Sequence, residues 1–353
     1  SAASDVYKRQ VQGSDVVAHS AGILDIKTNI LPNADALFLT AIDPYGHELW
    51  RWTFPVNKLN QQTEQLSPLS SRPIYTETEN DLTVKANKRT FIFSKKDGQL
   101  KGVSVDNRKI SFANGPRFIG ARRADRSLDQ FYNHDDEKAK EKDRTYSEFP
   151  DAAVFTKLDV KEDGGNLVVT ANYKLGNLDK AQWTINPSGE LALDYTYNFS
   201  GVVDLMGIRF DYPEDQVISK RWLGAGPYRV WQNRIHGTQY DVWENDYNDP
   251  IPGETFTYPE FKGYFGDVSW MNIQTKEGTI SLTNEAPDAY IGVYQPRDGR
   301  DRLLYTLPES GISVLNVIPP VRNKVNSTDL CGPSSQPKWV NGPQTGRVIF
   351  RFM

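Results

Sequence analysis

Apolar and polar positions alternate along most of the chain, and this pattern predicts strands. The clearest case is residues 191–199, where apolar side chains occupy every second position. A period of two places successive side chains on opposite faces, so the segment is predicted to be a half-buried strand. Similar segments recur about every 8–12 residues with turn residues between them, which is typical of a large antiparallel sandwich. The pattern predicts an all-β fold with little helix.

The predicted strands of this sandwich lie in the second part of the chain. They are residues 82–85, 90–94, 100–105, 166–173, 181–185, 191–199, 267–273, 279–283, 289–294, 311–315 and 347–352. A charged run at residues 135–144 predicts one short surface helix.

Breaks in the pattern divide the chain into four parts. Residues 5–10 translate back into GAT GTG TAT AAG AGA CAG, which resembles a transposon-end sequencing adaptor, so residues 1–10 are predicted to be an adaptor scar. Residues 11–60 contain a strand-like segment at 23–26 and two apolar runs around the turn Asp43-Pro-Tyr-Gly46, and are predicted to be part of a small antiparallel sandwich. Residues 61–80 lack periodicity and are predicted to be a linker, and residues 81–353 are predicted to form the large sandwich.

Composition narrows the classes of partner. The net charge of −4 provides no basic face for a phosphate backbone, so we expect no nucleic acid. No segment approaches the roughly 20 apolar residues of a membrane-spanning helix, so we expect no membrane span. The single cysteine, Cys331, excludes an internal disulfide and a cysteine-based metal site. Cellular location stays open, with a periplasmic or secreted location favoured over a cytoplasmic one.

Candidate catalytic groups are weak. Several carboxylates crowd one region (Glu244, Asp246, Asp249, Glu254 and Glu260) and could supply the pair that glycoside cleavage requires, but a solvated loop is the favoured interpretation. Glu285, in Thr283-Asn-Glu, is superficially similar to an acid/base motif. The four histidines have no metal-ligand spacing, so no metal or other cofactor is expected. We assign no catalytic residue.

Aromatic residues carry a stronger signal. They gather between residues 222 and 270 and include Trp222, Tyr228, Trp231, Tyr240, Trp243, Tyr247, Tyr258, Phe261, Tyr264, Phe265 and Trp270. Aromatic faces pack on the C–H faces of sugars while Arg and Asn bind hydroxyl groups, so the cluster fits a carbohydrate cleft. The same residues would also fill the core of a sandwich, and both interpretations stay open.

Three segments, in order, resemble the C-terminal region of glycoside hydrolase family 2 β-galactosidases. They are residues 81–125, with Phe91-Ile-Phe-Ser-Lys-Lys-Asp-Gly-Gln-Leu100 and Gly115-Pro-Arg-Phe118; Arg221-Trp-Leu-Gly-Ala-Gly-Pro227 followed by Asn233-Arg234; and Thr257-Tyr-Pro-Glu260 with Gly263 ahead of Trp270. The resemblance implies a partial immunoglobulin-like sandwich followed by a large β-supersandwich similar to galactose mutarotase. It also implies an upstream TIM-barrel domain of the same polypeptide, which carries the family's two catalytic glutamates and its cations.

The resemblance defines the candidate carbohydrate-binding residues, which are Trp231, Arg234, Glu260, Trp270 and Trp339. Trp339 ends residues 329–339, the nearest counterpart of a family loop whose tryptophan reaches the galactose pocket, although the family's Gly-Gly-Asp pattern is missing here and the spacing differs. The expected ligand is therefore a β-galactoside or a related plant or algal oligosaccharide. We predict a non-catalytic part of a retaining β-galactosidase-like enzyme that supports the barrel and helps to complete its sugar site. A freestanding carbohydrate-binding or mutarotase-like module, or a pure scaffold, are the alternatives.

Overall fold

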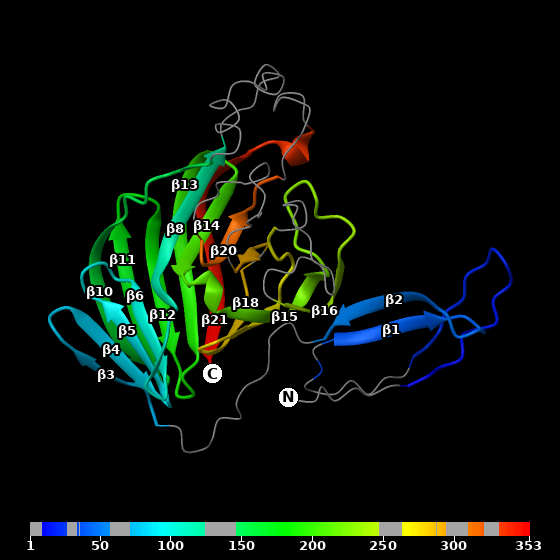
Figure 1. Cartoon of the computed structure of the whole chain (residues 1–353), viewed down its shortest axis with the longest axis horizontal. Helices are drawn as coiled ribbons and strands as arrows, with labels where there is room; N and C mark the ends of the chain where they lie inside the picture. The colour runs from blue at the N-terminus through cyan, green and yellow to red at the C-terminus, as the bar shows by residue number, and fades with distance from the viewer. Residues whose placement is uncertain are drawn as a thin grey trace. The chain divides into compact units, whose positions relative to one another are not determined.

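A computed structural model describes residues 9–26, 34, 36–56, 71–123, 146–246, 263–286, 288–293, 310–320 and 332–353. Its contacts divide the chain into two compact units, residues 1–57 and residues 58–353. The described part is built almost entirely from antiparallel strands in three sheets, which confirms the predicted all-β class (Figure 1). The regular helical elements named within it are two short 3₁₀ turns, η1 (Glu214–Gln216) and η4 (Pro333–Ser335).

The first unit contains a β-hairpin of β1 (Ala36–Ile42) and β2 (Glu48–Pro55). Asp43 forms its turn: one carboxylate oxygen accepts hydrogen bonds from the backbone N–H groups of Tyr45 and His47, each at 2.8 Å. The bond from the His47 backbone is the main reason why the pKa of Asp43 is lowered. The predicted hairpin is present, whereas residues 23–26 have no regular structure and do not form the predicted strand.

One face of this hairpin is entirely apolar. The cross-strand pairs Leu37–Phe54, Leu39–Trp52 and Ala41–Trp50 all lie on it. Trp50, Trp52 and Phe54 are 54%, 44% and 48% exposed. On the opposite face Arg51 lies over the ring of Phe38, 4.0 Å from its centroid, beside threonines.

The second unit contains two large sheets. The strands of the nine-stranded sheet, in spatial order, are β10 (Val154–Asp163), β11 (Asn166–Lys174), β12 (Leu178–Ile185), β13 (Leu191–Val203), β21 (Lys338–Phe352), β18 (Gly278–Asn284), β17 (Trp270–Thr275), β15 (Val217–Gly226) and β16 (Gln239–Asp246).

The other sheet has ten strands. Its main path is β19 (Tyr290–Gly292), β20 (Ile312–Val317), β14 (Leu205–Asp211), β8 (Ala113–Arg123), β6 (Leu100–Val105), β5 (Arg89–Ser94), β4 (Asp81–Ala86) and β3 (Ile74–Glu77), with β7 (Arg108–Ile110) on β6 and β9 (Tyr146–Glu148) on β8. Residues 74–77 lie inside the predicted linker, but they pair with β4 and so extend the sheet. The predicted surface helix at 135–144 lies outside the described residues.

The C-terminal strand β21 is much longer than the predicted strand at 347–352. Gly342, Pro343 and Gly346 conceal its first half, because glycine and proline usually mark turns. Pro343 fits because this part of β21 pairs with β13, whereas the pairing with β18 begins only at Val348. Its missing N–H therefore breaks no hydrogen bond between β21 and β18.

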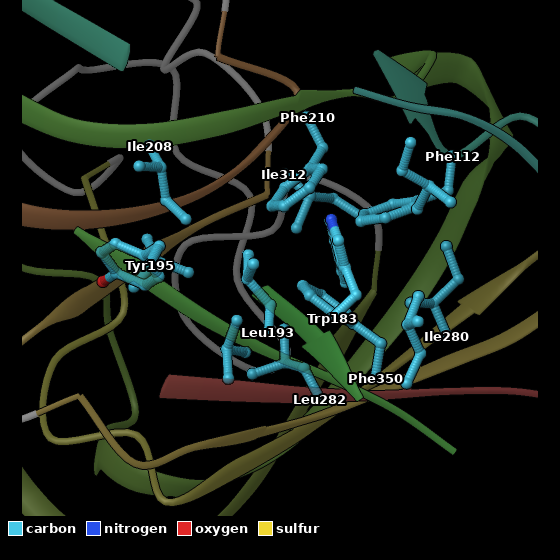
Figure 2. Packing of buried hydrophobic residues seen from close by; sticks show 14 of the residues in the cluster. Phe112, Trp183, Leu193, Tyr195, Ile208, Phe210, Ile280, Leu282, Ile312 and Phe350 are labelled. Atoms are coloured by element: carbon cyan, nitrogen blue, oxygen red, sulfur yellow. The ribbon is translucent and has the colours of Figure 1, made fainter. Parts of the chain in front are cut away.

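Alternation of apolar residues produces a core between the two sheets (Figure 2). Trp183 of the nine-stranded sheet lies 5.9 Å from Phe93 and 6.0 Å from Phe210 of the other sheet, measured between ring centroids. Phe112 stacks on Phe210 at 4.7 Å and contacts Phe350 of β21 at 5.0 Å. These side chains are all fully buried, so one aromatic cluster joins the layers.

Two tyrosines of β13 extend this core. Burial raises the pKa of Tyr195 and of Tyr197, whose rings stack with centroids 6.2 Å apart. The Tyr197 hydroxyl donates to Asn316 Oδ1 at 2.6 Å, while the buried Tyr195 hydroxyl has no hydrogen-bond partner among the described residues. The folded protein therefore strongly favours the neutral phenols.

We expect Trp183→Ala to lower the free energy of unfolding by about 3–5 kcal/mol, because it removes a buried ring that contacts both sheets. Urea unfolding followed by far-UV circular dichroism measures the change. Trp339→Ala is the matched control: this tryptophan is 72% exposed, so its loss should change stability by no more than about 0.5 kcal/mol. Equal effects of the two substitutions would contradict the assignment of Trp183 to the core.

Alkaline pH should destabilise the protein through its buried tyrosines. Their folded-state pKa values lie above the unfolded value of about 10, so the stabilisation is complete below that pH and is lost as the pH rises above it. Denaturant unfolding between about pH 9 and pH 11 should show this decline. Tyr195→Phe should make the decline shallower while costing little stability at neutral pH; an unchanged slope would contradict the assignment.

Candidate functional site

The segment Arg221–Pro227, one of the three that resemble the β-galactosidase family, begins inside β15. Its glycines serve close packing: a Cβ at Gly226 would lie 2.4 Å from the Trp243 ring, and one at Gly224 would lie 3.0 Å from the Gly266 carbonyl oxygen. Neither glycine is among the described residues with positive φ, so the role that the structure gives them is close packing.

The chain then forms a tight turn at residues 230–234, which we call the 230–234 turn. Val230 exchanges two backbone hydrogen bonds with Tyr264, at 2.7 and 2.9 Å, and the Arg234 N–H donates to the Trp231 carbonyl at 2.8 Å. Trp231 is fully buried and packs edge to face against Tyr264, with centroids 5.8 Å apart. The ring of Trp231 thus anchors the turn in a small second core that also contains Leu315.

The 230–234 turn also holds the segment that precedes β21. The Gln232 side-chain Nε2 donates to the Gln336 carbonyl oxygen at 2.8 Å, and Asn233 Nδ2 donates to Ser335 Oγ at 3.2 Å. The Gln232 backbone N–H donates to the Pro319 carbonyl at 3.0 Å, just after β20. Segments distant in the sequence therefore meet at this turn, which sequence patterns could not reveal.

Trp339 lies three residues beyond Gln336. It is the second residue of β21, pairs with Val202 of β13 and is 72% exposed. Its placement in a strand corrects the expectation of a loop. A largely exposed tryptophan near the end of a central strand presents its ring to solvent, which is the feature that a sugar platform requires.

The five predicted carbohydrate-binding residues lie in different environments. Trp339 and Arg234 are exposed at the surface. Trp231 and Trp270 are 0% and 1% exposed, so their rings act in packing and offer no face to a ligand in this structure. Glu260 lies outside the described residues. The aromatic candidates are therefore split between the protein interior, where Trp231 and Trp270 lie, and the surface, where Trp339 lies.

Trp270 is buried on the sheet face that points away from the main core. It pairs with Leu223 across β15 and β17, whereas Trp222 and Met271, on the other face, belong to the main core. The guanidinium of Arg221 lies 5.6 Å from the Trp270 ring centroid. This geometry explains why a tryptophan outside the main core is not available for stacking.

The charged candidates have structural explanations where they are described. Glu285 accepts from Arg347 at 3.1 Å, and Arg347 also binds Asp194 at 2.7 Å, so Glu285 lies in an ion-pair group on the nine-stranded sheet. Glu244 and Asp246 are exposed at the end of β16. Asp249 and Glu254 lie outside the described residues. Within the described ranges, no group of three or more acidic, histidine or cysteine side chains could hold a metal ion, and no helix could span a membrane.

The fold and the candidate site define the class of protein. It is a large antiparallel β-protein in which an anchored turn is hydrogen-bonded to the segment that leads to an exposed tryptophan. A family model described as beta galactosidase small chain matches residues 85–319. The match covers more than half of the chain, and the chain belongs to this family. The predicted relationship to β-galactosidases is confirmed at this level.

Structural comparison finds sugar epimerases of similar fold. A galactose 1-epimerase from Lactobacillus acidophilus NCFM shares 9% identity and a TM-score of 0.41, over 80% of this chain and 98% of that one. A GalM/aldose epimerase homologue from C. elegans shares 9% identity and a TM-score of 0.34, over 80% and 99% of the two chains. Likeness at this level carries no information about activity. Comparison with curated proteins gives no match.

Proposed function

We propose that this chain is the non-catalytic part of a retaining β-galactosidase-like glycoside hydrolase. Membership of the beta galactosidase small chain family is the observation that carries the proposal. In this proposal the chain supports a catalytic TIM barrel and contributes to the rim of its sugar site. The substrate is a β-galactoside or a related plant or algal oligosaccharide.

The topology supports a non-catalytic role. The paired strands in the described ranges are antiparallel, whereas the barrel that carries the glutamates in glycoside hydrolase family 2 consists of parallel strands and helices. The carboxylate Glu285, which resembled an acid/base residue, is engaged with Arg347. The chemistry is therefore assigned to a separate domain.

The hairpin supports a role in assembly. An isolated two-stranded hairpin is marginally stable in water, and this one exposes an apolar face with Trp50, Trp52 and Phe54. A face of this kind is typical of half of a β-sandwich. In this proposal it packs against further strands of an immunoglobulin-like domain that connects to the barrel.

The exposed ring of Trp339 supports a contribution to the sugar site. Indole faces bind the C–H face of a pyranose, and the 230–234 turn, which is hydrogen-bonded to the segment before Trp339, carries the exposed side chain of Arg234. A freestanding carbohydrate-binding module would use the same ring. The two functions differ in whether this chain binds sugar without a catalytic domain.

The purified chain is expected to leave a chromogenic β-galactoside uncleaved, because the catalytic glutamates lie elsewhere in this proposal. The matched experiment sequences the source DNA upstream of the Val11 codon, expresses the extended protein and assays it with the same substrate. We expect an open frame that encodes a barrel with two glutamates, and an extended protein that cleaves the substrate. Cleavage by the short chain well above a no-protein control would contradict the proposal.

Calorimetric titration of the purified chain with methyl β-galactoside separates the two functions. The accessory function predicts no saturable heat from the chain alone, together with a raised KM when Trp339→Ala is introduced into the extended enzyme. The binding-module function instead predicts saturable heat from the chain alone that disappears in Trp339→Ala. Trp50→Ala, which removes an exposed tryptophan from the hairpin, is the control and should leave the heat unchanged.

A further inference from the structure

We infer that Gln232 is a positioning residue that fixes the segment before β21 and thereby sets the orientation of Trp339. The inference rests on the proposed function only where it concerns sugar binding by Trp339. The positioning of Trp339 by Gln232 is a property of this chain alone. Its basis is the set of contacts made by the 230–234 turn.

The turn is a firm support. Trp231 is fully buried, and the two backbone bonds between Val230 and Tyr264 tie the turn to the segment that leads to β17. The Gln232 N–H is bound to the Pro319 carbonyl at 3.0 Å. The Gln232 side chain therefore extends from a backbone that is held on two sides.

The segment that this side chain binds needs such a support. Residues 332–337 contain the short turn η4 and then enter β21, whose first two residues are exposed. Strand ends with few buried contacts open most readily. Gln232 Nε2 binds the Gln336 carbonyl at 2.8 Å, two residues before the strand begins, and Asn233 adds a bond to Ser335. These bonds oppose the opening of the strand end that carries Trp339.

The state of the Gln232 amide argues for a role other than stability. The side chain is about nine-tenths buried, and its Oε1 has no hydrogen-bond partner among the described residues. A buried acceptor without a partner is unfavourable, and an apolar side chain of similar size would avoid that cost. The bond from Nε2 to Gln336 is the interaction that glutamine makes here and that an apolar side chain could not make.

The test uses the full chain labelled with 5-fluorotryptophan and observed by ¹⁹F NMR. The chain has eight tryptophans, and the Trp339 and Trp183 signals are assigned by Trp339→Phe and Trp183→Phe. Gln232→Met keeps the volume and removes the donor. We expect it to shift or broaden the Trp339 signal, leave the Trp183 signal in place and change the melting temperature little.

Gln239→Met is the matched control, because this exposed glutamine at the start of β16 undergoes the same substitution nearby. It should move neither signal. Gln232→Leu, which also lacks the donor and adds no charge at this buried position, should reproduce the effect of Gln232→Met and replaces it if the methionine variant does not fold. A Trp339 signal that is unchanged in a folded Gln232 variant overturns the inference.

This readout needs no sugar, so it separates the inference from the proposed function. A displaced Trp339 signal supports positioning even if the extended enzyme shows no β-galactosidase activity, in which case only the proposed function fails. In an active extended enzyme, Gln232→Met should raise KM for the chromogenic galactoside several-fold with little change in kcat. A change in kcat alone would contradict positioning at the sugar rim.

Discussion

The pairing of β21 with both β13 and β18 is the constraint on which the second unit depends. β21 lies between strands that are distant from it in the sequence (Figure 1). Its register with β13 runs from Lys338 to Phe350 without a described irregularity. Without β21, two strand edges in the middle of the sheet would lack hydrogen-bond partners. β21 thus joins the two halves of the nine-stranded sheet, β10–β13 and β15–β18, into one sheet.

The same strand connects the core to the exposed Trp339, the candidate sugar contact. Its second half contributes Phe350 to the aromatic cluster between the sheets, and its first half carries Trp339 into solvent. In the middle, the hydroxyl of Tyr195 on β13 lies over Gly346, where a Cβ would be only 2.3 Å away. The glycine that obscures the strand in the sequence is therefore the residue that lets the tyrosine pack across it.

Much of the fold was predictable because burial imposes a period of two. Residues 191–199 show it clearly, and β13 forms there with alternate side chains buried. The first half of β21 was not predictable, because Gly342 and Pro343 have turn-forming propensities and are accommodated only by the absence of a pairing with β18 at that position. Local propensity thus failed where the arrangement of neighbouring strands decided the outcome.

The candidate site was predictable only in part, for a similar reason. An aromatic side chain suits a sugar platform and a protein core equally well, so the sequence could not separate Trp231 and Trp270 from Trp339. The separation follows from contacts such as the packing of Trp231 on Tyr264. The bond from Gln232 to Gln336 joins residues 104 positions apart, and no local pattern encodes it. The candidate site is therefore a product of the folded sheets. The buried Trp231 fixes the 230–234 turn, the turn holds the end of β21, and the exposed Trp339 projects from that strand end.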